Sequence, residues 1–238
     1  MFIPLHDANA LRYIRKQYVT IGLIVVNVLV YAFTYVSSEE VQTAAVLGLG
    51  YIPALVHDLA DLPPQYQLIP EDLSYISYAF LHGSLLHLGG NMLFLWVFGD
   101  NVEDALGHVR FLIFYLLCAA AGAFVHGLVA PQSQVPLIGA SGAIAGIVAA
   151  YLILHPRVKI WVLAFARIPL RLPAWLVLAL WIAMQFAMLG FAGDEEISWA
   201  AHVGGIIAGA TLVVFLRKRG VPLFDKGLVT VVPAAATR

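Results

Sequence analysis

Residues 198–216 read SWAAHVGGIIAGATLVVFL, a stretch without a single Asp, Glu, Lys or Arg. A helix of about 20 apolar residues spans the hydrocarbon core of a bilayer, so this stretch predicts a transmembrane helix. His202 lies near its start, and an ionisable group at such a position is costly and usually marks function. Gly205 and Gly209 are four residues apart and form a small-residue face, on which the backbone of another helix can approach closely. We therefore expect a packed membrane helix. A histidine near the end of a span is, taken alone, more often an interface anchor, so the role of His202 depends on what other residues meet it.

The whole chain has the composition of a membrane protein. Of its 238 residues, 61% are hydrophobic and 11% are charged, with a mean hydropathy of +0.88. Soluble domains carry about 25% charged residues, so lipid must surround most of this chain. We expect an all-α membrane protein, a six-transmembrane-helix bundle over residues 18–216, with segment 1–17 before it and tail 217–238 after it. The predicted spans are residues 18–36, 84–100, 110–130, 139–155, 174–192 and 198–216.

The basic residues give this map an orientation. All 13 Lys and Arg fall in segments on one side of the six predicted spans, including residues 12–16, 157–171 and 217–238. An excess of Lys and Arg marks the cytoplasmic side, so both termini are expected there. Residues 37–83 then form a long external loop, and residues 156–173 form an interfacial segment on the cytoplasmic side. Cys118 is the one cysteine of the chain and excludes an intramolecular disulfide.

A second polar group opens the fourth predicted span, which begins Gly139-Ala140-Ser141-Gly142. A hydroxyl at a helix N-terminus lies beside unpaired N–H groups and a dipole that favours a developing anion. A lone serine in a membrane helix more often bonds its own backbone. However, Gly142 and Gly146 form a second small-residue face. If it packs on that of Gly205, the imidazole of His202 can come within hydrogen-bonding distance of Ser141.

A third polar cluster lies at the start of the second predicted span. His87 and Asn91 are four residues apart and share one helix face, while His82 lies in the entering loop. As single residues these could cap a helix or bond a neighbour. Together with Ser141 and His202 they fall at one depth, at the external ends of three spans, which favours a shared site.

These residues resemble the motifs of the rhomboid intramembrane serine proteases, over about residues 77–216. The matching elements are the His82/His87/Asn91 cluster, Gly139-x-Ser141-Gly142, and Ala201-His202-x-x-Gly205-x-x-x-Gly209. The set is specific because the three motifs occur in this order and on these spans, whereas any one of them would be weak.

The resemblance implies a role for each residue. Ser141 would attack the scissile carbonyl, and His202 would take its proton and pass it to the leaving amine. The side chains of His87 and Asn91, with the backbone N–H of Ser141, would bind the oxyanion. The supporting residues would be His82, Gly139, Gly142 and Gly205. Substrates would be transmembrane-helix proteins, cut within the lipid membrane, with no metal, cofactor or nucleic acid required.

Two positions depart from patterns common in this family. The first loop reads Asp72-Leu73-Ser74-Tyr75 where many members have a Trp-Arg pair. Ala145 stands one helical turn after the candidate nucleophile, where some bacterial members have a tyrosine stacked on the histidine. Neither change removes a reacting group, but both leave open how the loop and His202 are held in place.

Three other readings compete with a protease. A transporter or channel would show a repeat between the two halves of the chain and charges deep in its spans, and the sequence shows neither. A membrane metalloprotease needs His-Glu-x-x-His, which the sequence lacks. A non-catalytic rhomboid-like protein that binds transmembrane helices would share every feature except the chemistry. The compact six-span plan suggests a bacterial inner membrane, with the site opening to the external, periplasmic side.

Overall fold

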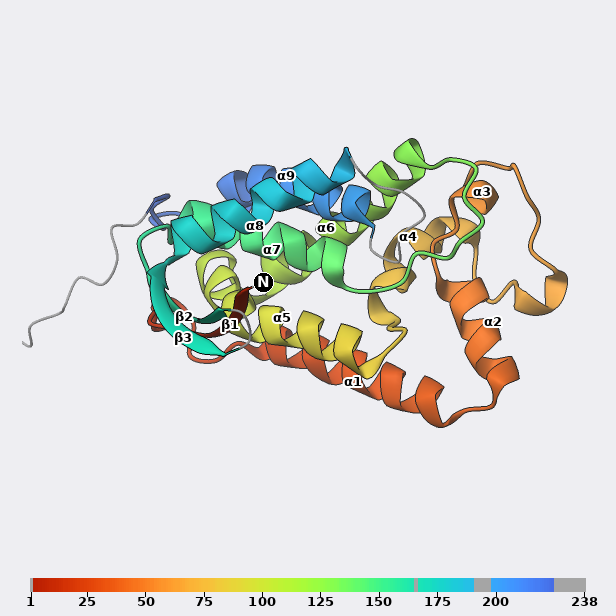
Figure 1. Cartoon of the computed structure of the whole chain (residues 1–238), viewed down its shortest axis with the longest axis horizontal. Coiled ribbons are helices and arrows are strands. Elements are labelled where there is room, and N and C mark those ends of the chain that lie inside the picture. Colours follow the sequence, from red (N-terminus) through yellow and green to blue (C-terminus); the bar gives the residue numbers. More distant parts are fainter. Residues whose placement is uncertain (1, 165–166, 191–197, 225–238) are drawn as a thin grey trace, which may run out of the picture.

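The computed structural model describes residues 2–164, 167–190 and 198–224. Six long helices dominate the described chain (Figure 1). They are α1 (Tyr18–Val36), α5 (Leu85–Leu106), α6 (His108–Val129), α7 (Ser141–Leu154), α8 (Ala174–Leu189) and α9 (Trp199–Leu216). Each predicted span falls on one of them. Residues 191 and 192 of the fifth predicted span lie outside the described residues.

Helix α7 forms the centre of the bundle. Every residue from Gly142 to Tyr151 is buried, and α7 is packed against α5, α6, α8 and α9. The outer helix α1 has only Thr20, Leu23 and Asn27 buried, so most of its apolar surface faces outward. An apolar helix that leaves this surface uncovered fits a lipid environment better than water.

Hydropathy and length identify membrane-crossing helices among the described residues. Helices α1, α6 and α9 are each long and apolar enough to cross a membrane. Helix α5 and the segment Glu71–Phe80 before it pass the same test as a pair bent by 84°. Helices α7 and α8 are apolar but shorter. The protein is therefore an integral membrane protein with three candidate spans, or four if the bent pair is one span, and six crossings remain a prediction.

The segment between α1 and α5 is folded rather than extended. It contains α2 (Glu39–Leu49), α3 (Pro53–Val56), α4 (Ser74–Ser77) and the 3-10 turns Pro64–Tyr66, Glu71–Leu73 and Tyr78–Phe80. An isolated bridge pairs Tyr51 with Leu137, just before α7. The Tyr78 hydroxyl donates to the carbonyl of Ala119 at 2.8 Å. These backbone and tyrosine contacts thus hold the segment in place in a chain that lacks the Trp-Arg pair common in this loop of other family members.

A small antiparallel sheet corrects the all-α prediction. It has the order β1-β2-β3, formed by β1 (Phe2–Asp7), β2 (Lys159–Ala164) and β3 (Ile168–Pro173). In β2 the side chains of Ile160, Val162 and Ala164 are buried while Lys159 and Trp161 are exposed. This alternation is typical of a strand with one covered face. Residues 156–173, expected to form an interfacial segment, thus contain the hairpin of β2 and β3. The strand β1, part of segment 1–17, is the third strand of the sheet.

The N-terminal strand is joined to the central helix by a buried polar contact. The Tyr151 hydroxyl of α7 donates to the Asp7 carboxylate at 2.5 Å. Burial raises the pKa of the Asp7 carboxyl above its ordinary value, which the hydrogen bond from Tyr151 only partly offsets. β1 is therefore anchored to the bundle as well as to β2.

Helix α5 continues six residues beyond its predicted end at residue 100 because its carboxylates find partners. Glu103 accepts from the backbone N–H groups of Val19 and Thr20 and from the Thr20 hydroxyl, at 2.7–3.0 Å. These are donors that the start of helix α1 leaves unpaired. Asp104 accepts from three consecutive backbone N–H groups, of residues 12–14, at 2.6–2.8 Å. The charged end of α5 thus fixes the segment that leads into α1.

We predict that Asp104→Ala destabilises the protein, because three partly buried hydrogen bonds from backbone N–H groups lose their charged acceptor. Hydrogen bonds to charged groups contribute about 1.5–3 kcal/mol each, so a loss of at least about 2 kcal/mol is expected. The unfolding midpoint should fall by roughly 4–8 °C. A thiol-reactive dye can measure this midpoint, because Cys118 is the chain's only cysteine, is buried, and reacts only once unfolding exposes it. Asp61→Asn, at an exposed position, is the control; equal midpoints for both variants would contradict the prediction.

Candidate active site

Ser141 and His202 are brought together at one end of the bundle. Ser141 is the first residue of α7, and His202 lies in the first turn of α9. The Ser141 Oγ and the His202 Nε2 are 2.9 Å apart, which is hydrogen-bonding distance. His202 is buried and Ser141 is partly buried. This is the geometry in which an imidazole can take a proton from a hydroxyl.

Glycines place the two helices at this separation. A Cβ on Gly205 would overlap the carbonyl oxygen of Gly142, and one on Gly209 would overlap the carbonyl oxygen of Gly146. The two small-residue faces expected from the sequence are therefore in direct backbone contact. Gly146 is also closed in by Cys118, whose Sγ would lie 2.5 Å from an added Cβ.

His82, His87 and Asn91 form a second group beside the loop that leads into α7. Asn91 Nδ2 lies 3.0 Å from His82 Nε2, and the rings of His82 and His87 meet edge to face with centroids 5.1 Å apart. A Cβ on Gly139 would lie 2.6 Å from His87 Nε2 and 3.7 Å from Asn91 Nδ2. The imidazole of His87 and the amide of Asn91 thus lie against the backbone two residues before Ser141.

Gly139 needs its conformation as well as its small size. Its φ is +119°, in a region that L side chains rarely adopt. Its N–H donates to the carbonyl of Tyr78 at 3.0 Å, which fixes the loop. Any side chain here would strain the backbone and displace His87.

The sequence interpretation missed Gln185 of α8. Its side chain is 1% exposed, and its Oε1 lies 2.8 Å from His202 Nδ1. Its Nε2 donates to the carbonyl of Trp181 at 3.0 Å. The available signal was a polar residue inside the apolar stretch 174–192, but nothing in the spacing shows which partner it meets. The acidic residues 194–196, which come shortly before His202 in the sequence, lie outside the described residues.

Two tryptophan rings pack beside His202 in this chain, which has Ala145 where some bacterial family members have a stacking tyrosine. The ring of Trp181 lies 6.2 Å from that of His202, and the ring of Trp199 meets it edge-on at 5.9 Å. Trp181 also packs against the small buried cluster that contains Ala145. The small side chain of Ala145 therefore leaves space that an α8 tryptophan covers.

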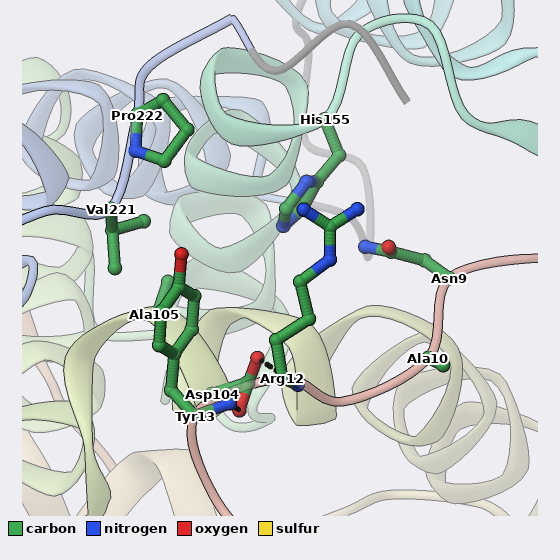
Figure 2. A pocket seen from close by; sticks show the side chains of 9 residues that line it. All are labelled: Asn9, Ala10, Arg12, Tyr13, Asp104, Ala105, His155, Val221 and Pro222. Carbon is green, nitrogen blue, oxygen red and sulfur yellow. Dashed lines mark hydrogen bonds between the residues drawn. The ribbon is translucent and has the colours of Figure 1, made fainter. Parts of the chain in front are cut away.

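A separate pocket lies at the opposite end of the bundle (Figure 2). Its lining comes from the N-terminal segment, the ends of α5 and α7, and the chain after α9: Asn9, Ala10, Arg12, Tyr13, Asp104, Ala105, His155, Val221 and Pro222. Figure 2 shows the Asp104 carboxylate directed at the backbone of the N-terminal segment, where it accepts hydrogen bonds. The Asp104 carboxylate already accepts hydrogen bonds from the backbone of residues 12–14. We therefore take Ser141 and His202, and not this pocket, as the candidate active site.

The fold and the site together define an integral membrane protein with a serine and a buried histidine at hydrogen-bonding distance. Residues 71–219 match the model of the Rhomboid domain, and the chain belongs to the rhomboid family.

Three relatives illustrate the match. Rhomboid protein 1, mitochondrial, of Saccharomyces cerevisiae is 30% identical over 183 residues, 73% of this chain and 51% of that protein. Presenilin-associated rhomboid-like protein, mitochondrial, of Homo sapiens is 34% identical over 139 residues, 57% of this chain and 36% of that protein. RHOMBOID-like protein 5 of Arabidopsis thaliana is 29% identical over 144 residues, 60% of this chain and 44% of that protein.

The chain spans about half, or less, of the length of these relatives. Two of the three carry mitochondrial names, and none of the three names points to a bacterial membrane. The expectation of a bacterial inner membrane therefore has no support from these comparisons.

We predict that Gly205→Ala separates α7 from α9, because its methyl group has no space beside the Gly142 carbonyl. Overpacking of this kind costs about 1–3 kcal/mol, so dye labelling of Cys118 should begin at a lower temperature. Gly22→Ala is the matched control, since an added Cβ there meets nothing within 4 Å. Identical midpoints for the two variants would show that the glycine contact is not needed.

Proposed function

We propose that this protein is an intramembrane serine endopeptidase that hydrolyses peptide bonds in or near the transmembrane helices of its substrates. The observation that carries the proposal is the 2.9 Å contact between Ser141 Oγ and His202 Nε2, in a member of the rhomboid family. In this proposal the bundle crosses the membrane six times, with both termini cytoplasmic and the site near the external face.

The reaction follows from the positions of the two groups. His202 Nε2 accepts the Ser141 proton as Oγ attacks the scissile carbonyl, and the imidazolium then protonates the leaving amine. Water, activated by the same nitrogen, releases the acyl group from Ser141. A site at the helix ends, rather than at mid-membrane, favours the entry of that water.

The oxyanion would be stabilised from two sides. Ser141 is the first residue of α7, so its backbone N–H has no acceptor within the helix and is available to an oxyanion. His87 and Asn91 lie against Gly139, on the loop that delivers this N–H. His82 bonds Asn91 and so holds its amide in place. Gly139 keeps the loop open, and Gly142 and Gly205 keep the nucleophile beside the base.

A non-catalytic protein that binds transmembrane helices is the alternative. It would require no hydrogen bond between Ser141 and His202 and no special conformation at Gly139. The presence of both reacting groups at bonding distance favours the protease.

We predict that purified protein in detergent or liposomes cleaves a single-span substrate, and that Ser141→Ala and His202→Ala abolish cleavage. A fluorophosphonate probe should label the wild type and not the Ser141→Ala variant, because labelling requires an activated hydroxyl. Ser133→Ala, in the loop before α7, is the serine control and should cut normally. Cleavage that survives Ser141→Ala would exclude this nucleophile. A folded wild type that neither cuts nor labels across several substrates would favour the helix-binding alternative.

We predict a graded loss for the oxyanion groups. Asn91→Ala and His87→Ala should each lower kcat by about 10²–10³-fold with a smaller effect on KM, because the donors act mainly in the transition state. Thermal unfolding followed at Cys118 separates this effect from misfolding. A change in KM alone would mean that these side chains bind substrate without stabilising the oxyanion.

A further inference from the structure

Gln185 is a buried amide inside an apolar helix, and both ends of its side chain are paired. Its Oε1 faces His202 Nδ1 at 2.8 Å and its Nε2 faces the Trp181 carbonyl at 3.0 Å. A buried amide without partners costs about 1–3 kcal/mol, so a glutamine at this position must make its hydrogen bonds.

The Trp181 carbonyl determines which way the amide points. A carbonyl can only accept a hydrogen bond, so the NH₂ group of Gln185 must face it. The amide oxygen then faces His202 Nδ1, and an oxygen can only accept. The proton of the neutral imidazole must therefore be on Nδ1, which leaves Nε2 free to accept the Ser141 hydroxyl proton. A chain of three hydrogen bonds thus selects the tautomer that a base needs.

We propose that Gln185 is the positioning residue of this site, which selects the Nδ1–H tautomer of His202 and fixes its ring plane toward Ser141. The proposal rests on the proposed protease function, in which it gives the Ser141–His202 pair a neutral third member. The role is indirect, since the hydrogen bonds of Gln185 are to His202 and to the Trp181 carbonyl, and not to Ser141.

The position of Gln185 connects this role to α8. Trp181 lies one turn earlier on α8, and its ring is close to those of His202 and of Phe94 on α5. The side chains that orient the base therefore come from a helix other than the two that carry Ser141 and His202. Loss of the Gln185 acceptor should disturb the base without separating α7 from α9.

Two variants of similar size test the role. Gln185→Met keeps the length and removes the acceptor, and we expect kcat to fall roughly 10²-fold with KM little changed. Gln185→Glu keeps an acceptor and adds charge, and we expect activity within about tenfold of wild type. A nearby carboxylate favours the imidazolium, so His202 would be inactivated by protonation at a higher pH and the acidic limb of kcat/KM should move upward. Gln132→Met, at an exposed loop position, is the control.

A second readout does not depend on cleavage. In protein labelled with ¹⁵N-histidine, the His202 ring signals should show Nδ1 protonated and Nε2 unprotonated in wild type, assigned by their loss in His202→Gln. Gln185→Met should give a mixture of tautomers. Wild-type tautomer and wild-type kcat in Gln185→Met would overturn the proposal. If wild type cuts no substrate, the protease proposal fails, while the tautomer measurement still decides the role of Gln185.

Discussion

Helices α7 and α9 touch through their backbones at Gly142 and Gly205, and again one turn further at Gly146 and Gly209. In lipid the hydrophobic effect does not drive helices together, so association depends on close packing and on polar contacts. With no side chains between the two backbones, their separation cannot vary without losing these contacts. Ser141 and His202 lie within three residues of the first glycine pair. Their 2.9 Å contact is therefore a direct consequence of helix packing.

Paired polar groups supply the second constraint, at both ends of the bundle. The carboxylates of Glu103 and Asp104 satisfy backbone donors around the start of α1, and the Gln185 amide satisfies His202 and a carbonyl of its own helix. Each group would be costly in an apolar interior if it were alone. The bundle is thus held by many specific polar contacts at its ends, while glycine and alanine allow close approach at its centre. The candidate site uses the same two kinds of contact.

Sequence patterns predict the parts of this structure that depend on local periodicity. The span at residues 18–36 coincides with α1, because a continuous apolar run needs no partner to be recognised. Helix α5 extends six residues past the predicted end of its span at residue 100, because Asp104 resembles a loop residue until its backbone partners, about 90 residues away, are known. The strand at Phe2–Asp7 depends likewise on a hairpin over 150 residues later. Gln185 was overlooked for the same reason, since its partner is fixed by tertiary packing alone.

A neutral amide behind the histidine suits a site in an apolar environment. In a Ser-His-Asp triad the third member carries a charge and stabilises the imidazolium that forms during attack. A buried carboxylate next to a neutral imidazole is an uncompensated charge in the resting enzyme, and desolvating it costs several kcal/mol. An amide oxygen avoids that cost, but it stabilises the imidazolium less. In the proposed mechanism the oxyanion groups and the α7 N-terminus must therefore supply a larger share of the transition-state stabilisation, and the backbone conformation of Gly139 shapes the loop against which His87 and Asn91 lie.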